Sequence, residues 1–521
     1  MYQIGTIFDL GLNKHLSHDD VLRLVAIRIE HISRLKISEN ERILLHKPNT
    51  YEFLLDLLAL WHLKLVAIPI PYESTDYEIE QYLKLAQAKW ILSDSTIVTF
   101  KKTKNINTSS VKEFPYKPIT LDIDFSSKRE ALILFSSGTT GKVKGIAHSL
   151  YSIMQRIISL RKVINSEELK NTMCILPLSF GHGLIGNSLL PFLSGANLFI
   201  APVFNSNFFL VWKEWLQKHK ITFFSTVPSF WRMLGRSDQL PKNTSLLRVH
   251  CASSVFTFNL WSQIENWIIE QNINFYNVYG LTEFASWVSG YNLKEEGYRP
   301  NYIGRTWGVD CKAIETNVDN IGEGCEVIET NVGSIGEIYE AIETNVDSIG
   351  EICEAIETNV GGIGEICLDS DSKMLGYLDE RNASVLKADS WIKTGDIGKI
   401  ENDKLFFYGR STNTINRGGK KISPEEIENV INLHEKVKDS FVFGHQLKSS
   451  EQQIIALVNP RVSGENQSVL LNELKLLCRS KLSKYKIPSI WHIVDDLFYN
   501  ARGKLDRKKS FEHFINSKTL F

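Results

Sequence analysis

The stretch that decides the fold reads Phe135-Ser136-Ser137-Gly138-Thr139-Thr140-Gly141-Lys142-Val143-Lys144-Gly145. It follows a short apolar run, residues 131–135, which predicts a buried strand, and it precedes a helix-like segment rich in Ile, Leu and Arg. Glycines let backbone N–H groups turn towards an oxyanion, and the Ser and Thr hydroxyls add further donors. The lysines supply the positive charge that phosphate oxygens favour. Composition alone would suit a solvated linker, but the flanking strand and helix favour a phosphate-binding loop.

This loop differs from the common nucleotide-binding P-loop, in which Gly-Lys is followed by Ser or Thr. Here Val143 follows Gly141-Lys142, and Ser136 stands where that loop has its first glycine. The order Ser-Ser-Gly-Thr-Thr-Gly-x-x-Lys-Gly instead resembles the phosphate loop of the adenylate-forming (AMP-binding) ligases. This superfamily includes acyl-CoA synthetases, the adenylation domains of peptide synthetases and luciferases.

The size and composition of the chain set limits on its class. A length of 521 residues predicts two or more domains, and 43% hydrophobic residues are typical of a globular protein. A net charge of −1 argues against nucleic acid as a partner. Seven cysteines without a CxxC pair suit reduced thiols, so we expect a cytoplasmic protein. We expect no signal peptide, and no transmembrane segment because charged or helix-breaking residues interrupt the most apolar stretches, 53–71 and 189–204.

Helical patterns alternate with apolar strands over residues 20–100 and again over 173–280, which predicts a doubly wound α/β arrangement. Polar and glycine residues follow several of these strands, at the edge where open α/β sheets bind ligands. We therefore predict a large α/β N-terminal domain over residues 1–409, with doubly wound sheets and a small strand subdomain. A small, mobile α+β C-terminal domain is predicted over residues 410–521.

Four near-copies of a 14-residue unit occupy residues 311–366. The unit predicts a strand followed by a turn. Its recurring cysteine invites a metal-binding interpretation, but Tyr339 breaks the series and no histidine joins it. A duplicated hairpin or a short stack of strands is favoured instead. We expect these tandem repeats to have little bearing on the chemistry, so that deleting residues 325–366 would leave adenylation intact.

Further motifs follow in the order found in the adenylate-forming ligases, and together they span nearly the whole chain. They are Pro177–Gly183, Asn277–Glu283, Ile303–Arg305, Gly364–Ile366 with Gly376–Leu378, Lys393–Asp396, the hinge segment 409–428 and Asn500–Lys508. The second of these matches the pattern Asn-x-Tyr-Gly-x-Thr-Glu at every fixed position. Three departures from the family's pattern occur: Val143 stands where it has Pro, Thr412 stands where its hinge has Asp or Lys, and residues 251–254 lack the glycines that it has beside the adenine.

The resemblance implies a role for each matching residue. The catalytic groups would be Lys504, Thr282 and Glu283, with Glu283 also holding Mg²⁺ and Lys504 reaching from the small domain to the carboxylate and the α-phosphate. Tyr279 would lie against the adenine, and Asp396 would accept from the ribose hydroxyls. The full nucleotide-binding set would be Ser136, Ser137, Gly138, Thr139, Thr140, Gly141, Lys144, Asn277, Tyr279, Gly280, Asp396 and Arg410. The acyl pocket would include Phe180, His182 and Gly304, and the thiol tunnel Gly418 and Gly419.

The activity implied by the resemblance is that of an acid–thiol ligase, with ATP and Mg²⁺ as cofactors and CoA or a pantetheine thiol as co-substrate. Phe180 stands where peptide-synthetase adenylation domains have an Asp for the substrate amine, so a fatty or aryl acid is favoured. One alternative is a free-standing adenylation enzyme that loads a separate acyl carrier protein, with an amino or hydroxy acid as a further option. Another is a nucleotide-binding homologue without catalysis, which Thr412 and the repeats suggest and the retention of Lys504, Glu283 and Asp396 opposes.

Overall fold

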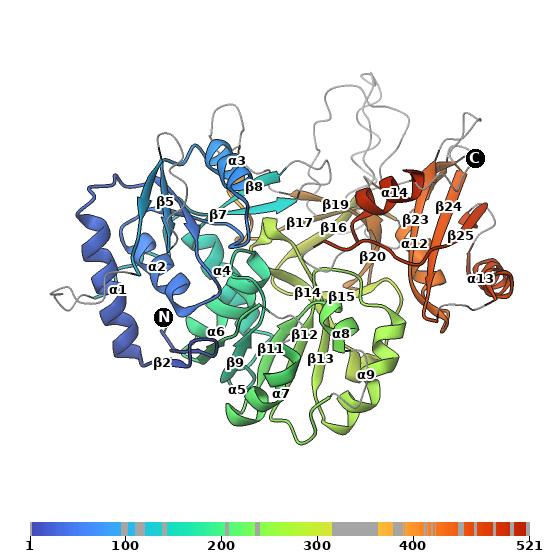
Figure 1. The fold of residues 1–521 in the computed structure, drawn as a ribbon, viewed down its shortest axis with the longest axis horizontal. Helices are drawn as coiled ribbons and strands as arrows, with labels where there is room; N and C mark the ends of the chain where they lie inside the picture. The colour runs from blue at the N-terminus through green and yellow to red at the C-terminus, as the bar shows by residue number, and fades with distance from the viewer. Residues whose placement is uncertain are drawn as a thin grey trace, which may run out of the picture.

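The computed structural model describes residues 3–94, 103–109, 120–137, 143–203, 208–234, 240–314, 363–378, 389, 391–410, 413, 415–417, 420–422, 424–445, 453–462, 466–482, 486–500 and 505–516. Two large sheets and a smaller C-terminal part lie side by side (Figure 1). This is the α/β arrangement predicted from the sequence, with a large N-terminal and a small C-terminal domain. The boundary between residues 409 and 410 stays a prediction.

The first sheet contains seven of the described strands and carries the phosphate loop. In spatial order they are β18 (Gly376–Tyr377), β8 (Val143–Ser149), β7 (Glu130–Ser137), β4 (Val66–Pro69), β3 (Arg42–His46), β5 (Trp90–Ser93) and β6 (Lys104–Ile106). Strands β7 and β8 are antiparallel, and Ser136 pairs with Lys144. The predicted loop therefore connects two strands, and the helix expected after Ser149 begins at Leu150. Residues 143–149 form a strand because their side chains from Gly145 onward are buried in the sheet.

The second sheet contains thirteen of the described strands. In spatial order they are β16 (Asp310–Ile314), β17 (Gly364–Asp369), β19 (Ile392–Glu401), β20 (Lys404–Arg410), β15 (Tyr302–Thr306), β14 (Trp287–Asn292), β13 (Asn274–Gly280), β12 (Arg248–Cys251), β11 (Phe223–Thr226), β9 (Asn171–Cys174), β10 (Asn197–Ile200), β1 (Thr6–Asp9) and β2 (Lys14–Leu16). Neighbours from β13 to β1 run parallel, as in a doubly wound sheet. From β14 to β16 the pairs are antiparallel, and this part corresponds to the predicted strand subdomain.

Helices cover the two sheets and pack between them. They are α1 (His18–Ser33), α2 (Tyr51–His62), α3 (Asp76–Ala86), α4 (Leu150–Arg161), α5 (Ser166–Leu169), the π-helix η1 (His182–Leu189), α6 (Leu190–Phe192), α7 (Phe208–Lys218), α8 (Pro228–Leu234), α9 (Phe258–Glu270), the 3₁₀-helix η3 (Thr282–Phe284) and α10 (Leu293–Glu296). Side chains at both starts fix α1 and α3, because Ser17 with Asp20 and Thr75 with Glu78 form capping boxes. No helix in the described part of the chain is both long and apolar enough to cross a membrane.

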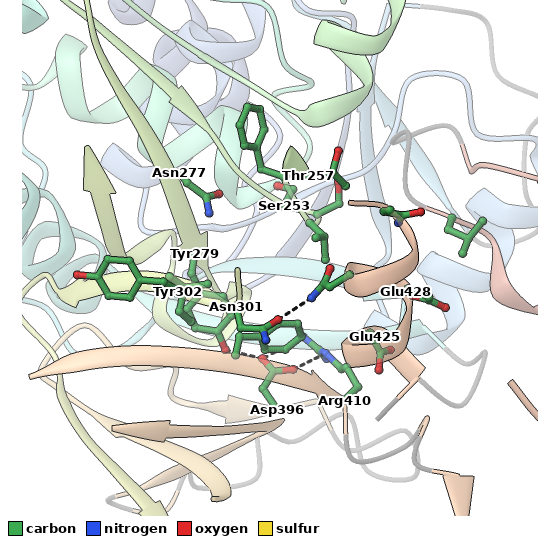
Figure 2. A pocket seen from close by; sticks show the side chains of 18 of the residues that line it. Ser253, Thr257, Asn277, Tyr279, Asn301, Tyr302, Asp396, Arg410, Glu425 and Glu428 are labelled. Atoms are coloured by element: carbon green, nitrogen blue, oxygen red, sulfur yellow. Dashed lines mark hydrogen bonds and ion pairs between the residues drawn. The ribbon is translucent and has the colours of Figure 1, made fainter. Parts of the chain in front are cut away.

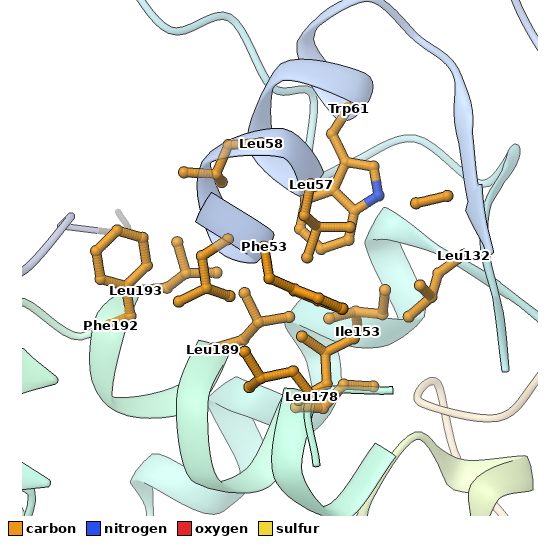
Figure 3. Packing of buried hydrophobic residues seen from close by; sticks show 14 of the residues in the cluster. Phe53, Leu57, Leu58, Trp61, Leu132, Ile153, Leu178, Leu189, Phe192 and Leu193 are labelled. Carbon is orange, nitrogen blue, oxygen red and sulfur yellow. The ribbon is translucent and has the colours of Figure 1, made fainter. Parts of the chain in front are cut away.

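A shared apolar core fixes the two sheets relative to each other. Phe53, Leu57 and Trp61 from α2 pack in one cluster with Ile153 of α4 and Leu189 of η1 (Figure 3). The indole of Trp61 also donates to the carbonyl oxygen of Ala131 at 3.0 Å, at the start of β7. The strand that leads to the phosphate loop is therefore held by the centre of the core.

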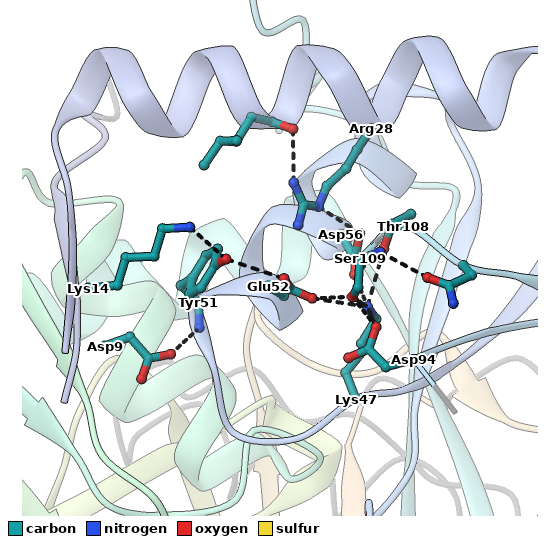
Figure 4. Close-up of polar contacts among 12 residues, drawn as sticks. Asp9, Lys14, Arg28, Lys47, Tyr51, Glu52, Asp56, Asp94, Thr108 and Ser109 are labelled. Atoms are coloured by element: carbon teal, nitrogen blue, oxygen red, sulfur yellow. Dashed lines mark hydrogen bonds and ion pairs between the residues drawn. The ribbon is translucent and has the colours of Figure 1, made fainter. Parts of the chain in front are cut away.

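A buried polar cluster joins the ends of β3 and β5 to the helices above them (Figure 4). The ammonium of Lys47 is fully buried, ion-paired to Asp56 at 3.3 Å and to Glu52 at 3.4 Å, and bonded to Asp94. Arg28 of α1 pairs with the same Asp56 at 2.9 Å. Every charge in this cluster has a partner of opposite sign, as burial requires.

The C-terminal part has its own small sheet and core. Its elements are β21 (Ile415–Arg417), β22 (Lys420–Ile422), α12 (Pro424–Ile431), β23 (Val437–His445), β24 (Gln453–Pro460), α13 (Gln467–Lys481), β25 (Ile490–Ile493) and α14 (Arg507–Asn516). One apolar cluster contains only residues from Ile415 onward, which supports a separate domain.

The repeats enter the second sheet between two neighbouring strands. Strand β16 ends at Ile314, which pairs with Glu365 of β17. Residues 315–362 lie outside the described residues, so the predicted duplicated hairpin is not tested. The two flanking strands pair directly with each other in antiparallel register.

Candidate functional site

A pocket of about 320 Å³ lies where the large domain meets the small one (Figure 2). Strands β12 and β13 end at this pocket, as predicted for a doubly wound sheet. Its lining contains five of the predicted nucleotide-binding residues: Asn277, Tyr279, Gly280, Asp396 and Arg410. From the small domain, Glu425, Glu428, Leu505 and Arg507 also line it.

Asp396 is the buried centre of a cluster of three polar side chains in this pocket, Asp396, Arg410 and Tyr279, called here the Asp396 group. It lies on β19 directly opposite Arg410 on β20, and the guanidinium Nε of Arg410 is 2.6 Å from Asp396 Oδ1. The hydroxyl of Tyr279 donates to the other carboxylate oxygen. Burial and the carboxylate charge together raise the pKa of Tyr279 well above its usual range, so the phenol stays protonated and keeps donating.

A second predicted pair, Thr282 and Glu283, forms η3 immediately after β13. The imidazole Nε2 of His148 lies 2.8 Å from the carbonyl oxygen of Thr282. Burial lowers the pKa of His148 to about 4, so the ring is neutral near pH 7, and Nε2–H is the donor in this bond. The guanidinium of Arg156 on α4 donates to the carbonyl oxygen of Phe284, two residues after Thr282, at 3.2 Å.

Strand β18 connects Glu283 to the flank of the phosphate loop. The hydroxyl of Tyr377 donates to Glu283 Oε1 at 2.9 Å, and the ammonium of Lys144 lies 5.2 Å from the centre of the Tyr377 ring. The last residues of the predicted loop and the predicted metal ligand are therefore neighbours. Ser136, on β7, is the strand partner of Lys144.

Sequence reasoning missed His148, Arg156 and the role of Tyr377 in this arrangement. The Gly-Tyr motif drew attention to residue 377 but not to its hydroxyl. No strand was predicted over residues 143–149, so nothing in the sequence indicated that the side chain of His148 faces inward. No pattern in the sequence marks Arg156 as buried, although its side chain is fully enclosed.

The three predicted acyl-pocket residues lie in different surroundings. His182 begins η1, with Nδ1 2.8 Å from the hydroxyl of Ser253 and Nε2 2.6 Å from that of Ser225. Ser253 lines the pocket, whereas His182 and Phe180 do not. Backbone packing explains why residue 304 is a glycine. Its φ is +90°, and a Cβ there would lie 2.1 Å from the carbonyl carbon of Gly290.

Several predicted residues cannot be placed. Gly138, Thr139, Thr140, Gly141, Gly418, Gly419 and Lys504 lie outside the described residues. Ser137 ends β7. Leu505, the residue after Lys504, lines the pocket.

The predicted Mg²⁺ site can be examined through its donor atoms. No group of three or more His, Cys, Asp or Glu side chains that could hold a metal occurs within the residues that the structure describes. Mg²⁺ is commonly bound through one or two carboxylates together with phosphate oxygens of the substrate. The single carboxylate of Glu283, beside the loop flank, suits that mode of binding.

Comparison with known proteins identifies the class to which this fold and pocket belong. The family model for AMP-binding enzymes matches residues 6–378, and the model for the C-terminal domain of AMP-binding enzymes matches residues 426–504. The chain therefore belongs to the AMP-binding enzyme family, and the resemblance noted in the sequence is confirmed.

Relatives of similar length align along most of the chain. It is 24% identical to an oxalate–CoA ligase of Arabidopsis thaliana, covering 96% of this chain and 93% of the relative. It is also 24% identical to a 2-succinylbenzoate–CoA ligase of Lactococcus lactis, covering 92% of each.

Solved structures share the fold. ATP-bound MatB from Rhodopseudomonas palustris superposes with a TM-score of 0.79 at 18% identity, covering 98% of this chain and 96% of that chain. An o-succinylbenzoate CoA synthetase from Bacillus subtilis, in complex with its acyl-adenylate intermediate, superposes with a TM-score of 0.75 at 19% identity, covering 97% and 94%.

Proposed function

We propose that the chain activates a carboxylic acid with ATP and then transfers the acyl group to the thiol of CoA. The relatives named above are CoA ligases, and one structural neighbour holds an acyl-adenylate. The observation that carries the proposal is the Asp396 group, which opens onto a pocket that both domains line. No described residue favours a carrier protein over CoA as acceptor.

The reaction proceeds in two steps. A carboxylate oxygen attacks the α-phosphorus of ATP; the new O–P bond replaces the bond to pyrophosphate, which leaves with its electron pair. The thiol of CoA then loses its proton, and the sulfur attacks the acyl carbon. The bond from that carbon to the AMP oxygen breaks, and AMP leaves. Both steps concentrate negative charge on phosphoryl oxygens, so donors and cations must surround them.

Each predicted residue contributes to this chemistry through its own donor or acceptor. Asp396, held by Arg410 and Tyr279, presents carboxylate oxygens to the ribose hydroxyls, while Asn277 and Gly280 border the base. Glu283, oriented by Tyr377, would hold Mg²⁺, which neutralises phosphate charge when bound. Lys144 adds a cation at the loop flank, and Lys504 would neutralise the attacking carboxylate and the α-phosphate.

Two adjacent observations support the role of Lys504. Leu505 and Arg507, which follow it in the chain, line the pocket from the small domain. Arg507 is anchored there by an ion pair of 2.6 Å to Glu428 and one of 3.1 Å to Glu425. The small domain over residues 410–521 would thus deliver its lysine to the nucleotide and withdraw it for the thiol step.

The class of acid is the finer part of the proposal. Phe180 stands where an Asp would bind the amine of an amino acid, so an α-amino acid substrate is disfavoured. The sequence alone favours a fatty or aryl acid. The relatives' acids, oxalate and 2-succinylbenzoate, carry a second carboxylate. Buried donors behind the pocket favour a short, oxygen-bearing acid over a fatty or aryl one.

The test is exchange of labelled pyrophosphate into ATP with a panel of carboxylic acids, followed by mass identification of the thioester formed with CoA. Lys504→Ala should abolish exchange while ATP binding, followed by calorimetry, survives. An enzyme that exchanges with no acid, or a variant that exchanges at the normal rate, would overturn the proposal.

A further inference from the structure

A layer directly behind the pocket contains four buried polar atoms without hydrogen-bond partners among the described residues. They are Asn187 Nδ2, His250 Nδ1, Ser286 Oγ and Trp287 Nε1. The four side chains are at most 4% exposed. Buried polar groups in proteins are nearly always hydrogen-bonded, so four such atoms in one layer point to a ligand that completes them.

The protonation of these atoms follows from their neighbours. Arg248 Nε lies 2.8 Å from His250 Nε2, and a guanidinium can only donate. His250 Nε2 is therefore the acceptor, and the ring proton is on Nδ1. Burial, together with the charge of Arg248, lowers the pKa of His250 well below its usual range, so the ring is neutral.

The remaining atoms are donors as well. Asn187 Oδ1 accepts from the backbone N–H of Ser225, which leaves its Nδ2 as the unpaired end of the amide. An indole nitrogen only donates, and the Ser286 hydroxyl can donate in any direction. A layer made of donors is complementary to an oxygen acceptor and offers nothing to a hydrocarbon chain.

Contacts link this layer to the pocket. Ser253 lines the pocket and bonds to His182, whose other nitrogen bonds to Ser225. The Trp287 ring lies edge-on to His182, with centroids 5.5 Å apart, and to His250, with centroids 4.5 Å apart. The donors therefore begin one side chain behind the pocket wall.

The same side chains limit the size of a ligand. A Cβ added to Gly186 of η1 would lie 2.6 Å from Ser286 Oγ and 2.9 Å from the Trp287 ring. Helix η1 therefore packs closely against Ser286 and Trp287, which leaves little room there for a long alkyl chain or an aryl ring.

Resting on the proposed function, we infer that the acid has a short acyl group ending in an oxygen acceptor, a second carboxylate or a carbonyl, which these donors receive. Asn187, His250, Ser286 and Trp287 are then the residues that determine specificity. The activated carboxyl group stays in the pocket, towards the Asp396 side.

Matched acids in the pyrophosphate-exchange assay test this inference on the full chain. Malonate, acetoacetate and butanoate are of similar length and differ in their far oxygen atoms; octanoate and benzoate test size. We expect kcat/KM for malonate or acetoacetate to exceed that for butanoate at least tenfold, and the better of the two identifies carboxylate or carbonyl. Equal or faster exchange with butanoate, octanoate or benzoate overturns the inference and leaves the proposed function standing, whereas no exchange with any acid overturns both.

Two variants probe the donors themselves. Trp287→Phe keeps a ring and removes the N–H, and Asn187→Asp keeps the size and the acceptor while it removes the amide donor. Either should lower the ratio of kcat/KM for the preferred acid to that for butanoate at least fivefold. Trp212→Phe is the matched control, because this buried indole of α7 also lacks a described partner but belongs to a separate apolar cluster; it should leave the ratio unchanged. An unchanged ratio in both test variants overturns the inference.

Discussion

Asp396 determines the polar geometry of the pocket, because two of its neighbours are oriented by its charge. Asp396→Asn keeps the size and an acceptor for Tyr279 but removes the charge that faces Arg410. We expect kcat/KM in the exchange assay to fall about 100-fold, or about 3 kcal/mol in the transition state. Tyr279→Phe is the control that leaves the ion pair intact, with an expected loss of about tenfold or less. Equal losses in the two variants would contradict the central role of the charge.

His148 provides a pH-dependent contribution to stability. Burial lowers its pKa in the folded chain to about 4 from an ordinary value of 6.5. Between these values the unfolded chain binds a proton that the folded chain excludes, so the free energy of unfolding decreases as the pH falls from 6.5 towards 4. The full effect is about 3 kcal/mol.

The variant His148→Gln isolates this contribution. Glutamine keeps an N–H donor for the carbonyl of Thr282 and does not titrate. Urea unfolding of both proteins near neutral pH and in mild acid should show a pH dependence that is weaker in the variant by about 3 kcal/mol across this range. Parallel pH dependences in the two proteins would show that His148 is not held neutral.

At the scale of elements, the pairing of β14 with β15 depends on Gly304. Its φ is +90°, and Gly290 leaves no space for a Cβ. Gly297 also has a positive φ, +66°, but no atom lies within 4 Å of the position a Cβ would take. A substitution at Gly297 therefore tests backbone strain alone, whereas the same substitution at Gly304 tests backbone strain together with a steric clash.

We expect Gly297→Ala to lower the free energy of unfolding by about 1–3 kcal/mol, because its φ of +66° with ψ of 176° is a backbone conformation that essentially only glycine adopts. Gly304→Ala should cost about 3 kcal/mol more, because the β14 backbone must move aside. Thermal and urea unfolding measure both values. Similar losses in the two variants would mean that the strands separate at little cost.

The repeats offer a test of how far β16 and β17 depend on what joins them. Deleting residues 325–366, as first suggested by the sequence, would place Gly324 where the fully buried Ile366 stands. Deleting residues 315–356 instead removes three units and joins Ile314 to Glu357. The first and last units share the sequence Ala-Ile-Glu-Thr-Asn-Val, so the junction restores one complete unit and leaves both strands intact.

The shorter protein without residues 315–356 should keep its exchange activity within about twofold, which is about 0.4 kcal/mol. The protein without residues 325–366 should be destabilised by about 2–5 kcal/mol, as when a buried isoleucine is lost. Comparing the two by activity and urea unfolding checks the prediction. Loss of activity in the first would assign the repeats a part in the reaction.

The contrast between β8 and β13 explains how much the sequence could predict. The alternation of helices and apolar strands placed Tyr279 correctly at the end of a strand, because that alternation has a strong period. Strand β8 was not predicted: residues 143–145 were assigned to the loop and residues 146–149 to the stretch before a helix, because apolar and polar residues do not alternate there. The donor layer around Trp287 and His250 has no local signature, because it joins η1, β12 and β14, and Asn187 and Trp287 are 100 residues apart in the chain.

At the scale of the whole molecule, several polar contacts join the small domain to the large one. Asn259 of α9 donates its side-chain amide to the carbonyl oxygens of Asn432 and Val437, at 2.9 and 3.0 Å. Asn429 of α12 donates to Asn301 at 2.6 Å. Water can replace these bonds only when the domains separate, so each contact favours the arrangement seen here over the others that the proposed domain movement would reach.

Asn259→Leu should therefore act on one half-reaction. Leucine leaves two buried carbonyl oxygens without donors in this arrangement alone, at a cost of about 2 kcal/mol or more. Because Leu505 lines the nucleotide pocket in the same arrangement, we expect pyrophosphate exchange to fall about 30-fold or more. Thioester formation from supplied acyl-adenylate and CoA should keep its rate if, as proposed, that step uses another domain orientation. Asn266→Leu, at an exposed position of the same helix, is the control and should change neither rate; equal losses of both half-reactions in Asn259→Leu would show that the two steps share one arrangement.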